Sequence, residues 1–274
     1  MTLNVASPEG LSHAFASEIS RFSCAAYESL LDAEPPAAAS KSLGWAVVRH
    51  YYASFYCAHA LLRISGSALT YISPATAQKI NRIAGAYLGI LPSLKAGIHV
   101  VRFDRDNNQQ VTVTRLSAGS GGSHEDMWTV FLEFTKEAEA EIIRSLGRDS
   151  EGPNGAAQIL EDVRRCFRGA GWASGLRNGV NYRQEHGVWF PWARRERDAV
   201  ALSDRMRLWK PTAVSGLHLS ATEDELIQLA DVCNVLVHLM TAVLKDIVKR
   251  SRCRNGCFVD RLPFRYLKSR HVAL

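Results

Sequence analysis

Hydrophobic residues recur at helical spacing through most of the 274-residue chain. Within 40–65, apolar and aromatic residues alternate at steps of three and four, at Trp45, Val48, Tyr52, Phe55, His59 and Leu62. This spacing places them on one face of an amphipathic helix. Similar stripes predict helices over 11–33, 75–90, 124–146 and 155–168, and the charged stretch 194–208 is also interpreted as helical. A capping box, Thr222-Glu223-Asp224-Glu225, predicts a long helix that ends near residue 250.

One stretch departs from the helical period. Two β-prone runs flank Asp106-Asn107-Asn108, a pattern typical of a hairpin. The Gly/Ser-rich segment after them contains no phosphate-loop motif, so the whole of 98–123 is interpreted as an insertion. The pattern therefore predicts a mainly all-α fold, an up-and-down helical bundle with a small β-hairpin insertion, formed by a single domain over 1–274.

Composition supports a globular protein with a sizeable core, since 47% of residues are hydrophobic and 22% are charged. The most apolar run, 43–64, contains Arg49, His50, His59 and Arg63, which argues against a membrane span. The first residues show neither the basic nor the apolar region of a signal peptide. Six cysteines without an evident disulfide framework fit reduced thiols, so we expect a cytoplasmic protein with no membrane partner.

Positive charge is concentrated at the C-terminus. Residues 244–274 contain nine Lys or Arg and two Asp, a net charge of +7, whereas the whole chain carries +6. The other 243 residues therefore sum to −1. The basic C-terminal tail, 251–274, is either a surface that attracts nucleic acid or an ordinary solvated tail.

The stretch "SGLRNGVNYRQEHGVWFPW", residues 174–192, concentrates candidate functional side chains in a glycine-rich region. Its Arg177-Asn178 pair and the helix "WAVVRHYYASFYCAHALLRISG" together resemble HEPN domains, which are small helical bundles of prokaryotic toxins, defence systems and nucleotidyltransferase partners. The family motif is Arg-Asn-x-x-x-His. Here Tyr182 stands at the position of that histidine.

The resemblance implies RNA cleavage without metal or cofactor, in which the 2′-hydroxyl of the RNA attacks the neighbouring phosphorus. An arginine suits the phosphate because its planar guanidinium matches phosphate oxygens, and a histidine suits proton transfer near neutral pH. The residues that the resemblance implies for catalysis are Arg177, Asn178, Tyr182 and His186. Arg183, Arg49, Arg194 and Arg195 are the candidates for binding RNA phosphates. Tyrosine is a poor base at neutral pH, so His186, or an Arg183–His186 pair, is the alternative source of an imidazole.

Structural interpretations of the same residues stay open. Arg177 can pair with Glu161 or Asp162, and the Asn178-Gly179 pair can simply form a turn. Tyr182 and Trp189 can belong to the core. The aromatic run Trp189, Phe190 and Trp192 can stack on RNA bases, although a hydrophobic plug is the more common use of such a run. The resemblance also implies that a polar residue of the aromatic helix, here Arg49 or His50, can face the active groove of the family. His59 is interpreted as a core histidine.

Other enzyme classes find no support, because the chain lacks a dinucleotide fingerprint, a Gly-x-Ser-x-Gly elbow and a His-Glu-x-x-His motif. Cys253 and Cys257 are too few for a zinc site, so no metal is expected.

We therefore expect a HEPN-like RNA-binding protein, a possible metal-independent endoribonuclease, that acts in bacterial stress response or phage defence. The resemblance also implies a homodimer, because the active groove of such proteins forms between two copies. The alternative is a non-catalytic interaction module that pairs with a cognate antitoxin or another protein of a defence system.

Overall fold

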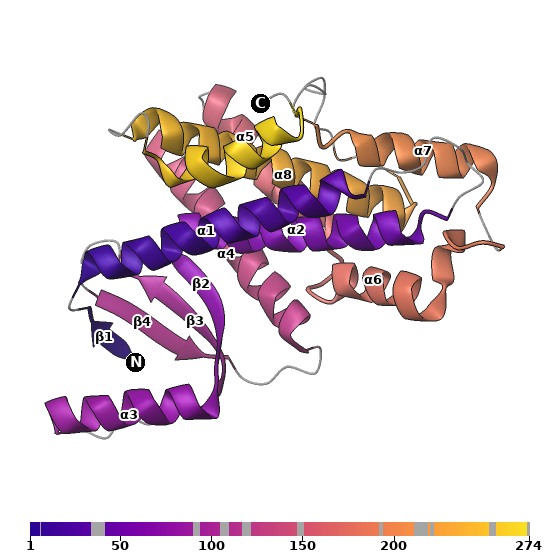
Figure 1. The fold of residues 1–274 in the computed structure, drawn as a ribbon. Coiled ribbons are helices and arrows are strands. Elements are labelled where there is room, and N and C mark those ends of the chain that lie inside the picture. The colour runs from indigo at the N-terminus through magenta and orange to yellow at the C-terminus, as the bar shows by residue number, and fades with distance from the viewer. Residues whose placement is uncertain are drawn as a thin grey trace.

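The computed structural model describes residues 1–5, 7–33, 42–89, 94–104, 110–116, 122–146, 151–191, 194–210, 219, 222–251 and 256–272. Within them the helices are α1 (Pro8–Leu31), α2 (Gly44–Ile64), α3 (Pro74–Leu88), α4 (Gly122–Leu146), α5 (Glu151–Cys166), α6 (Trp172–Arg183), α7 (Glu196–Arg207), α8 (Glu225–Arg250) and α9 (Arg265–Ser269). The strands are β1 (Thr2–Asn4), β2 (Ser67–Ile72), β3 (Gly97–Phe103) and β4 (Gln110–Arg115). The mainly α-helical fold expected from the sequence is confirmed (Figure 1).

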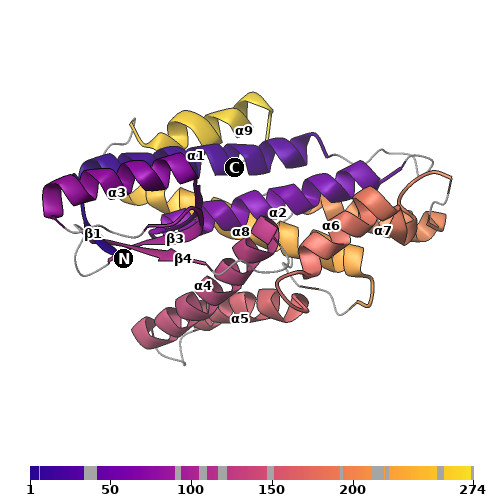
Figure 2. The same cartoon turned by 90° about the horizontal axis from the view of Figure 1, so that it is seen from below.

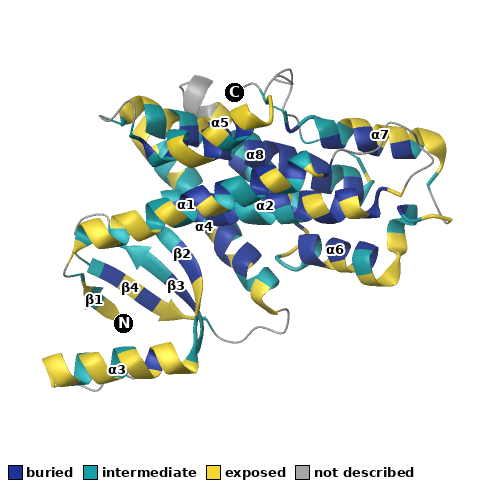
Figure 3. Ribbon diagram, in the orientation of Figure 1, coloured by how far each residue is buried: buried dark blue, intermediate teal, exposed yellow. Residues whose placement is uncertain are grey.

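Helices α2 and α8 form the centre of the molecule. α2 packs against α1, α8, α6 and α4, and both central helices are largely buried (Figure 3). α8 is long and apolar enough to cross a membrane by length and composition alone, but 67% of its most apolar window is buried inside the protein. Burial of this kind is what the core helix of a bundle requires.

The start of α8 shows how its capping residues work. The carboxylate of Asp224 accepts hydrogen bonds from the backbone N–H groups of Leu226 and Ile227, and the hydroxyl of Thr222 accepts from the N–H of Asp224. Asp224 is therefore the N-cap, two residues after the first residue of the predicted capping box.

The β structure is larger than the predicted hairpin. β3 and β4 pair antiparallel as expected, but β2 joins the outer side of β3 and β1 joins β4, in the order β1-β4-β3-β2. The hairpin turn at 105–109 lies outside the described residues. The predicted insertion also ends earlier than residue 123, because α4 begins at Gly122. Strands from three separate parts of the sequence thus build one small sheet beside the bundle.

The glycine-rich 174–192 cluster, for which the sequence predicted no helix, begins in helix α6. Its first ten residues lie in a regular helix, whose buried face includes Ala173, Leu176 and Val180. Glycine disfavours helix, but packing of this apolar face on α2 outweighs the weak local propensity. The segment that follows, Gln184 to Val188, leaves the helix with positive φ at Gln184 and His186.

The C-terminal segment is folded rather than a solvated tail over the part of it that the structure describes. Asp260–Phe264 forms a π-helical turn that continues into α9. Val259, Phe264 and Leu267 are buried in the core. The basic residues of its described part remain exposed, namely Arg261, Arg265, Lys268 and Arg270. α1 and α2 lie between α9 and α6 in both views of the molecule (Figures 1 and 2), so this charge does not flank the 174–192 cluster.

Candidate functional site

Arg177 is a buried cation without an acidic partner among the residues that the structure describes. Its residue exposure is 8%, and its guanidinium carbon lies 5.3 Å from the ring centre of Tyr51 and 5.6 Å from that of Tyr52, both on α2. No carboxylate of the described residues lies within ion-pair distance of it, and its Nε has no hydrogen-bond partner. Burying a cation and an N–H group in this way is costly unless a further group completes the site.

Tyr51 joins Arg177 to an imidazole. The Tyr51 hydroxyl lies 2.7 Å from Nδ1 of His124, near the start of α4, and accepts a 3.4 Å hydrogen bond from Nε1 of Trp128. The positive charge of Arg177 lies beside the same phenol and favours its ionised form. Because the indole N–H of Trp128 can only donate, this arrangement favours the tautomer in which Nδ1 of His124 accepts the hydroxyl proton. In this tautomer the other ring nitrogen, Nε2, carries the ring proton and is a hydrogen-bond donor.

The electrostatics leave Arg177 as the charged member of this group. Burial raises the pKa of Tyr51 to about 12, so the phenol is neutral. Burial and the positive charge of Arg177 lower the pKa of His124, so its imidazole is neutral at neutral pH. The result is a site with one positive charge, one phenol and one neutral imidazole, contributed by α6, α2 and α4.

A second polar cluster lies farther along α2. The ring of Phe55 contacts both His124 and His59, with ring centres 4.5 and 4.7 Å apart. His59 accepts from Arg63 at 3.1 Å, and Arg63 forms an ion pair with Glu18. Burial and Arg63 lower the pKa of His59 to about 3, which confirms His59 as a neutral core histidine. The charge of this cluster is therefore already balanced inside the fold.

The other residues expected to act in catalysis do not gather around Arg177. Asn178 and Tyr182 are exposed, Tyr182 with 71% of its surface in solvent, so Tyr182 does not belong to the core either. His186 follows α6, and its backbone carbonyl accepts from Nε of Arg194 at 3.0 Å. None of these three residues has a hydrogen bond to Arg177 within the described part of the chain. The motif is split because Asn178 and Tyr182, one and five residues after Arg177 on α6, face other sides of the helix, whereas His186 lies beyond its end.

The acidic partners proposed for Arg177 are also occupied elsewhere. Glu161 and Asp162 both pair with Arg165 of α5. The structural interpretation in which either of them neutralises Arg177 is therefore wrong.

Three of the four cations expected to bind phosphate are paired with carboxylates. Arg183 pairs with Glu185 at 2.8 Å, and Arg49 pairs with Asp32 at 3.7 Å. Arg194 makes two bonds, of 2.7 and 3.0 Å, to the carboxylate that caps α8. Arg194 thereby connects the segment after α6 to the start of α8, and its guanidinium is already engaged. The fourth cation, Arg195, is exposed directly before α7.

Trp189 is the plug that the sequence suggested. Its Nε1 donates to the Val180 carbonyl at 2.6 Å, and its ring packs so close to Gly44 that a Cβ at position 44 would lie 2.2 Å from it. Phe190, in contrast, exposes 75% of its surface, and Trp192 lies outside the described residues. The aromatic run therefore divides into one structural ring and one exposed ring.

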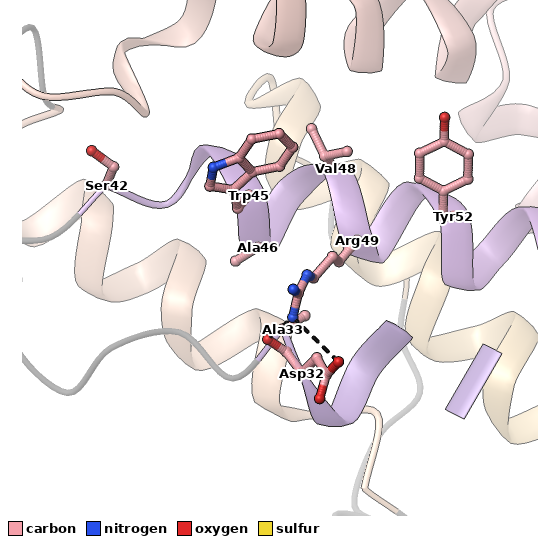
Figure 4. A pocket seen from close by; sticks show the side chains of 8 residues that line it. All are labelled: Asp32, Ala33, Ser42, Trp45, Ala46, Val48, Arg49 and Tyr52. Carbon is pink, nitrogen blue, oxygen red and sulfur yellow. Dashed lines mark hydrogen bonds and ion pairs between the residues drawn. The ribbon is translucent and has the colours of Figure 1, made fainter. Parts of the chain in front are cut away.

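A cavity of about 580 Å³ opens beside this plug. It is lined by α2, by Asp32 and Ala33 at the end of α1, and by Ser42. Figure 4 shows Trp45, Val48 and Tyr52 in a row along α2, with Arg49 extending toward Asp32. Tyr52 contacts Arg177 as well, so the cavity and the Arg177 group share one side chain. His50, the other polar residue considered for this groove, is buried between the carbonyls of Ala46 and Met206 and faces the core.

The site residues that motif reasoning missed are Tyr51, Tyr52 and His124. The two tyrosines are part of the aromatic helix pattern, which predicted the helix but did not single out these side chains. His124 follows a glycine-rich stretch and carries no motif of its own. A metal role is also unsupported within the described residues, which contain no cluster of three or more His, Cys, Asp or Glu able to hold an ion.

Neither a family model, a curated protein nor a solved structure matches this chain. The resemblance to HEPN domains rests on the motifs of α2 and α6 and on the helical layout.

Proposed function

We propose that this protein is a HEPN-like RNA-binding protein that holds a backbone phosphate with Arg177. The observation that carries the proposal is the buried guanidinium of Arg177, which has no carboxylate partner among the described residues and an unpaired Nε. An isolated buried cation destabilises a fold, because desolvation is not offset by an opposite charge. A phosphate supplies that charge, together with acceptor oxygens that match the planar guanidinium.

The surrounding groups suit an anion. Tyr51 and Tyr52 hold the guanidinium from one side, and His124 presents an Nε2–H donor in the tautomer that its bond to Tyr51 favours. A neutral imidazole can donate a hydrogen bond to a phosphate oxygen and adds no further charge to the site. The charges of Arg183 and Arg194 are neutralised by carboxylates, so Arg177 carries the recognition.

RNA accounts for the exposed aromatic side chains near this group better than free phosphate does. Trp45 exposes 62% of its surface and Phe190 exposes 75%, and the N–H of Phe190 donates to Ser42 beside the cavity. Aromatic rings in such positions stack on the unpaired bases of single-stranded RNA. The resemblance to HEPN proteins adds a cytoplasmic role in bacterial stress response or phage defence to the proposal.

Cleavage of the bound RNA is a second candidate, favoured by the imidazole of His124 at the Arg177 group. The 2′-oxygen would form a bond to phosphorus while the bond from phosphorus to the 5′-oxygen breaks, leaving a 2′,3′-cyclic phosphate. The proton of the 2′-hydroxyl would pass to Nε2 of His124 and then to the 5′-oxygen. This route needs the other tautomer, in which Nδ1–H donates to the Tyr51 oxygen.

Binding is tested by fluorescence anisotropy with a labelled single-stranded RNA of mixed sequence. We expect Arg177→Met to weaken binding about ten-fold or more, since a charged hydrogen bond is lost. Arg165→Met is the matched control, because Arg165 is exposed and already paired on α5. Equal affinities for the wild type and the Arg177 variant would contradict the proposal, as would the absence of RNA binding by the wild-type protein.

Cleavage is tested on the same RNA in the presence of a metal chelator. Production of fragments that end in a cyclic phosphate, and their loss in His124→Gln, would support the nuclease form. RNA that is bound but left intact would assign the protein to binding alone.

The rival function, an interaction module for a cognate antitoxin or defence protein, is supported by the exposure of Tyr182 and Phe190. A stoichiometric protein partner recovered from the native host, without RNA affinity, would favour it. The proposal also includes a homodimer, which light scattering of the purified protein measures directly.

A further inference from the structure

The cavity that Tyr52 shares with the Arg177 group has a lining suited to a flat ring. Trp45, Val48, Arg49 and Tyr52 occupy positions i, i+3, i+4 and i+7 of α2, so one helix face forms its wall. Its volume of about 580 Å³ falls within the range of small-molecule sites.

Trp45 gives this wall an apolar ring that the fold leaves uncovered. The ring exposes 62% of its surface, although a tryptophan at the edge of a core is normally covered. It is held by an edge-to-face contact with Trp189, whose ring centre lies 5.6 Å away at 89°. Trp189 is itself fixed by its hydrogen bond to Val180. The Trp45 ring is therefore positioned before any ligand arrives, which lowers the entropy cost of stacking.

The lining of the cavity also offers polar groups suited to the edge of a base. Arg49 and Asp32 form a half-exposed ion pair, with side-chain exposures of 44% and 54%. The guanidinium provides donors and the carboxylate provides acceptors, as the edge of a nucleobase requires. A purely apolar anchor, such as a leucine from a partner protein, would have to desolvate this pair without replacing its hydrogen bonds.

Tyr52 connects the cavity to the proposed phosphate position. Its ring lines the cavity and also lies 5.6 Å from the guanidinium carbon of Arg177. A phosphate at Arg177 and a ring in the cavity are thus separated only by the Tyr52 side chain. Such a short separation suits a backbone phosphate and a neighbouring base of the same strand. From this arrangement we infer that the cavity is a nucleobase subsite for single-stranded RNA whose phosphate is held by Arg177. The inference rests on the proposed function.

The experiment compares two probes, a labelled oligoadenylate RNA and a matched strand whose ribose-phosphate backbone lacks bases. We expect Trp45→Leu to weaken binding of oligoadenylate about ten-fold and to leave the base-free strand unaffected, since stacking of one base on an aromatic ring has an effect of that size. Tyr87→Leu is the matched control, because Tyr87 is 85% exposed on α3. It should change neither affinity.

The outcomes separate the subsite from the proposed function. If Trp45→Leu binds both strands as the wild type does, while Arg177→Met loses both, the subsite is wrong and phosphate binding stands. If the wild type binds neither strand, the proposed function fails, and binding of free adenosine by the wild type but not by Trp45→Leu would then support the subsite by itself. Loss of a protein partner in Trp45→Leu at unchanged RNA affinity would assign this surface to protein contact instead.

Discussion

Replacement of Arg177 by methionine decides whether this side chain is buried for a ligand or for the fold. Methionine has a similar length and no charge, so it fills the space between α6 and α2 without leaving a cavity. If Arg177 serves the fold, its replacement lowers the stability of the protein. If it serves a ligand, its replacement lowers the affinity for that ligand instead.

The expected change in the free energy of unfolding follows from the contacts of Arg177. The variant loses two ring contacts, each about 0.5–1 kcal/mol. It is relieved of an unpaired buried N–H group, whose burial costs about 1–3 kcal/mol. The net change therefore lies between a loss of about 1 kcal/mol and a gain of about 2 kcal/mol, so the melting temperature should change by no more than about 8 °C.

Binding should show the opposite behaviour. With single-stranded RNA at a hundred times its dissociation constant, the wild type gains about 2.7 kcal/mol of stability. The variant should gain almost nothing at that concentration. Urea unfolding followed by circular dichroism, with and without RNA, measures both effects in one series.

Arg205→Met provides the contrast. Nε of Arg205 lies 2.7 Å from the Asp231 carboxylate, which is only 4% exposed. Removing the arginine takes an ion-pair partner from this buried charge, and the loss should be about 3 kcal/mol. If Arg177→Met destabilises the protein as much as Arg205→Met, and RNA gives both proteins the wild-type gain, then Arg177 serves the fold and the reasoning is refuted.

Three further predictions concern packing and pH. Gly44→Ala should displace the ring of Trp189 and cost about 1–3 kcal/mol in urea unfolding. Gly175→Ala, with no atom within 4 Å of the added Cβ, should stabilise α6 by about 0.5–1 kcal/mol. Equal effects of the two substitutions would disprove the close approach of Trp189 to Gly44. Burial lowers the pKa of His59 to about 3 from an ordinary value of 6.5, so the unfolded chain binds a proton that the native state excludes. Stability should therefore fall by up to about 1.4 kcal/mol per pH unit from pH 6.5 down to about 3, and His59→Gln should flatten this slope. Arg194→Ala should destabilise the start of α8, seen as faster hydrogen exchange there than in the wild type, because its carboxylate partner is the N-cap; unchanged exchange would argue against that role.

Hydrophobic periodicity by itself predicts most of the helices. α2, α4 and α8 lie within a few residues of their predicted ranges, because a period of three to four apolar positions acts over one helix face. The two strands of the hairpin also have a local signal. The short strands β1 and β2 have none, since their pairing partners lie far along the chain.

Helix α6 and the folded C-terminal segment depend on tertiary contacts. Gly175 and Gly179 weaken the local helical signal, and only the packing of neighbouring apolar residues on α2 makes the helix favourable. In the C-terminal segment, the density of basic residues conceals Phe264 and Leu267, which are buried in the core.

For the candidate site, the sequence by itself determined Arg177 and the aromatic character of α2, because both belong to short motifs. Tertiary structure alone decided which groups meet. It placed the phenol of Tyr51 and the imidazole of His124 at the guanidinium, and left Tyr182 in solvent. The physical reason is that a motif records spacing along one helix, whereas a binding site is formed by the faces that several packed helices turn toward one another.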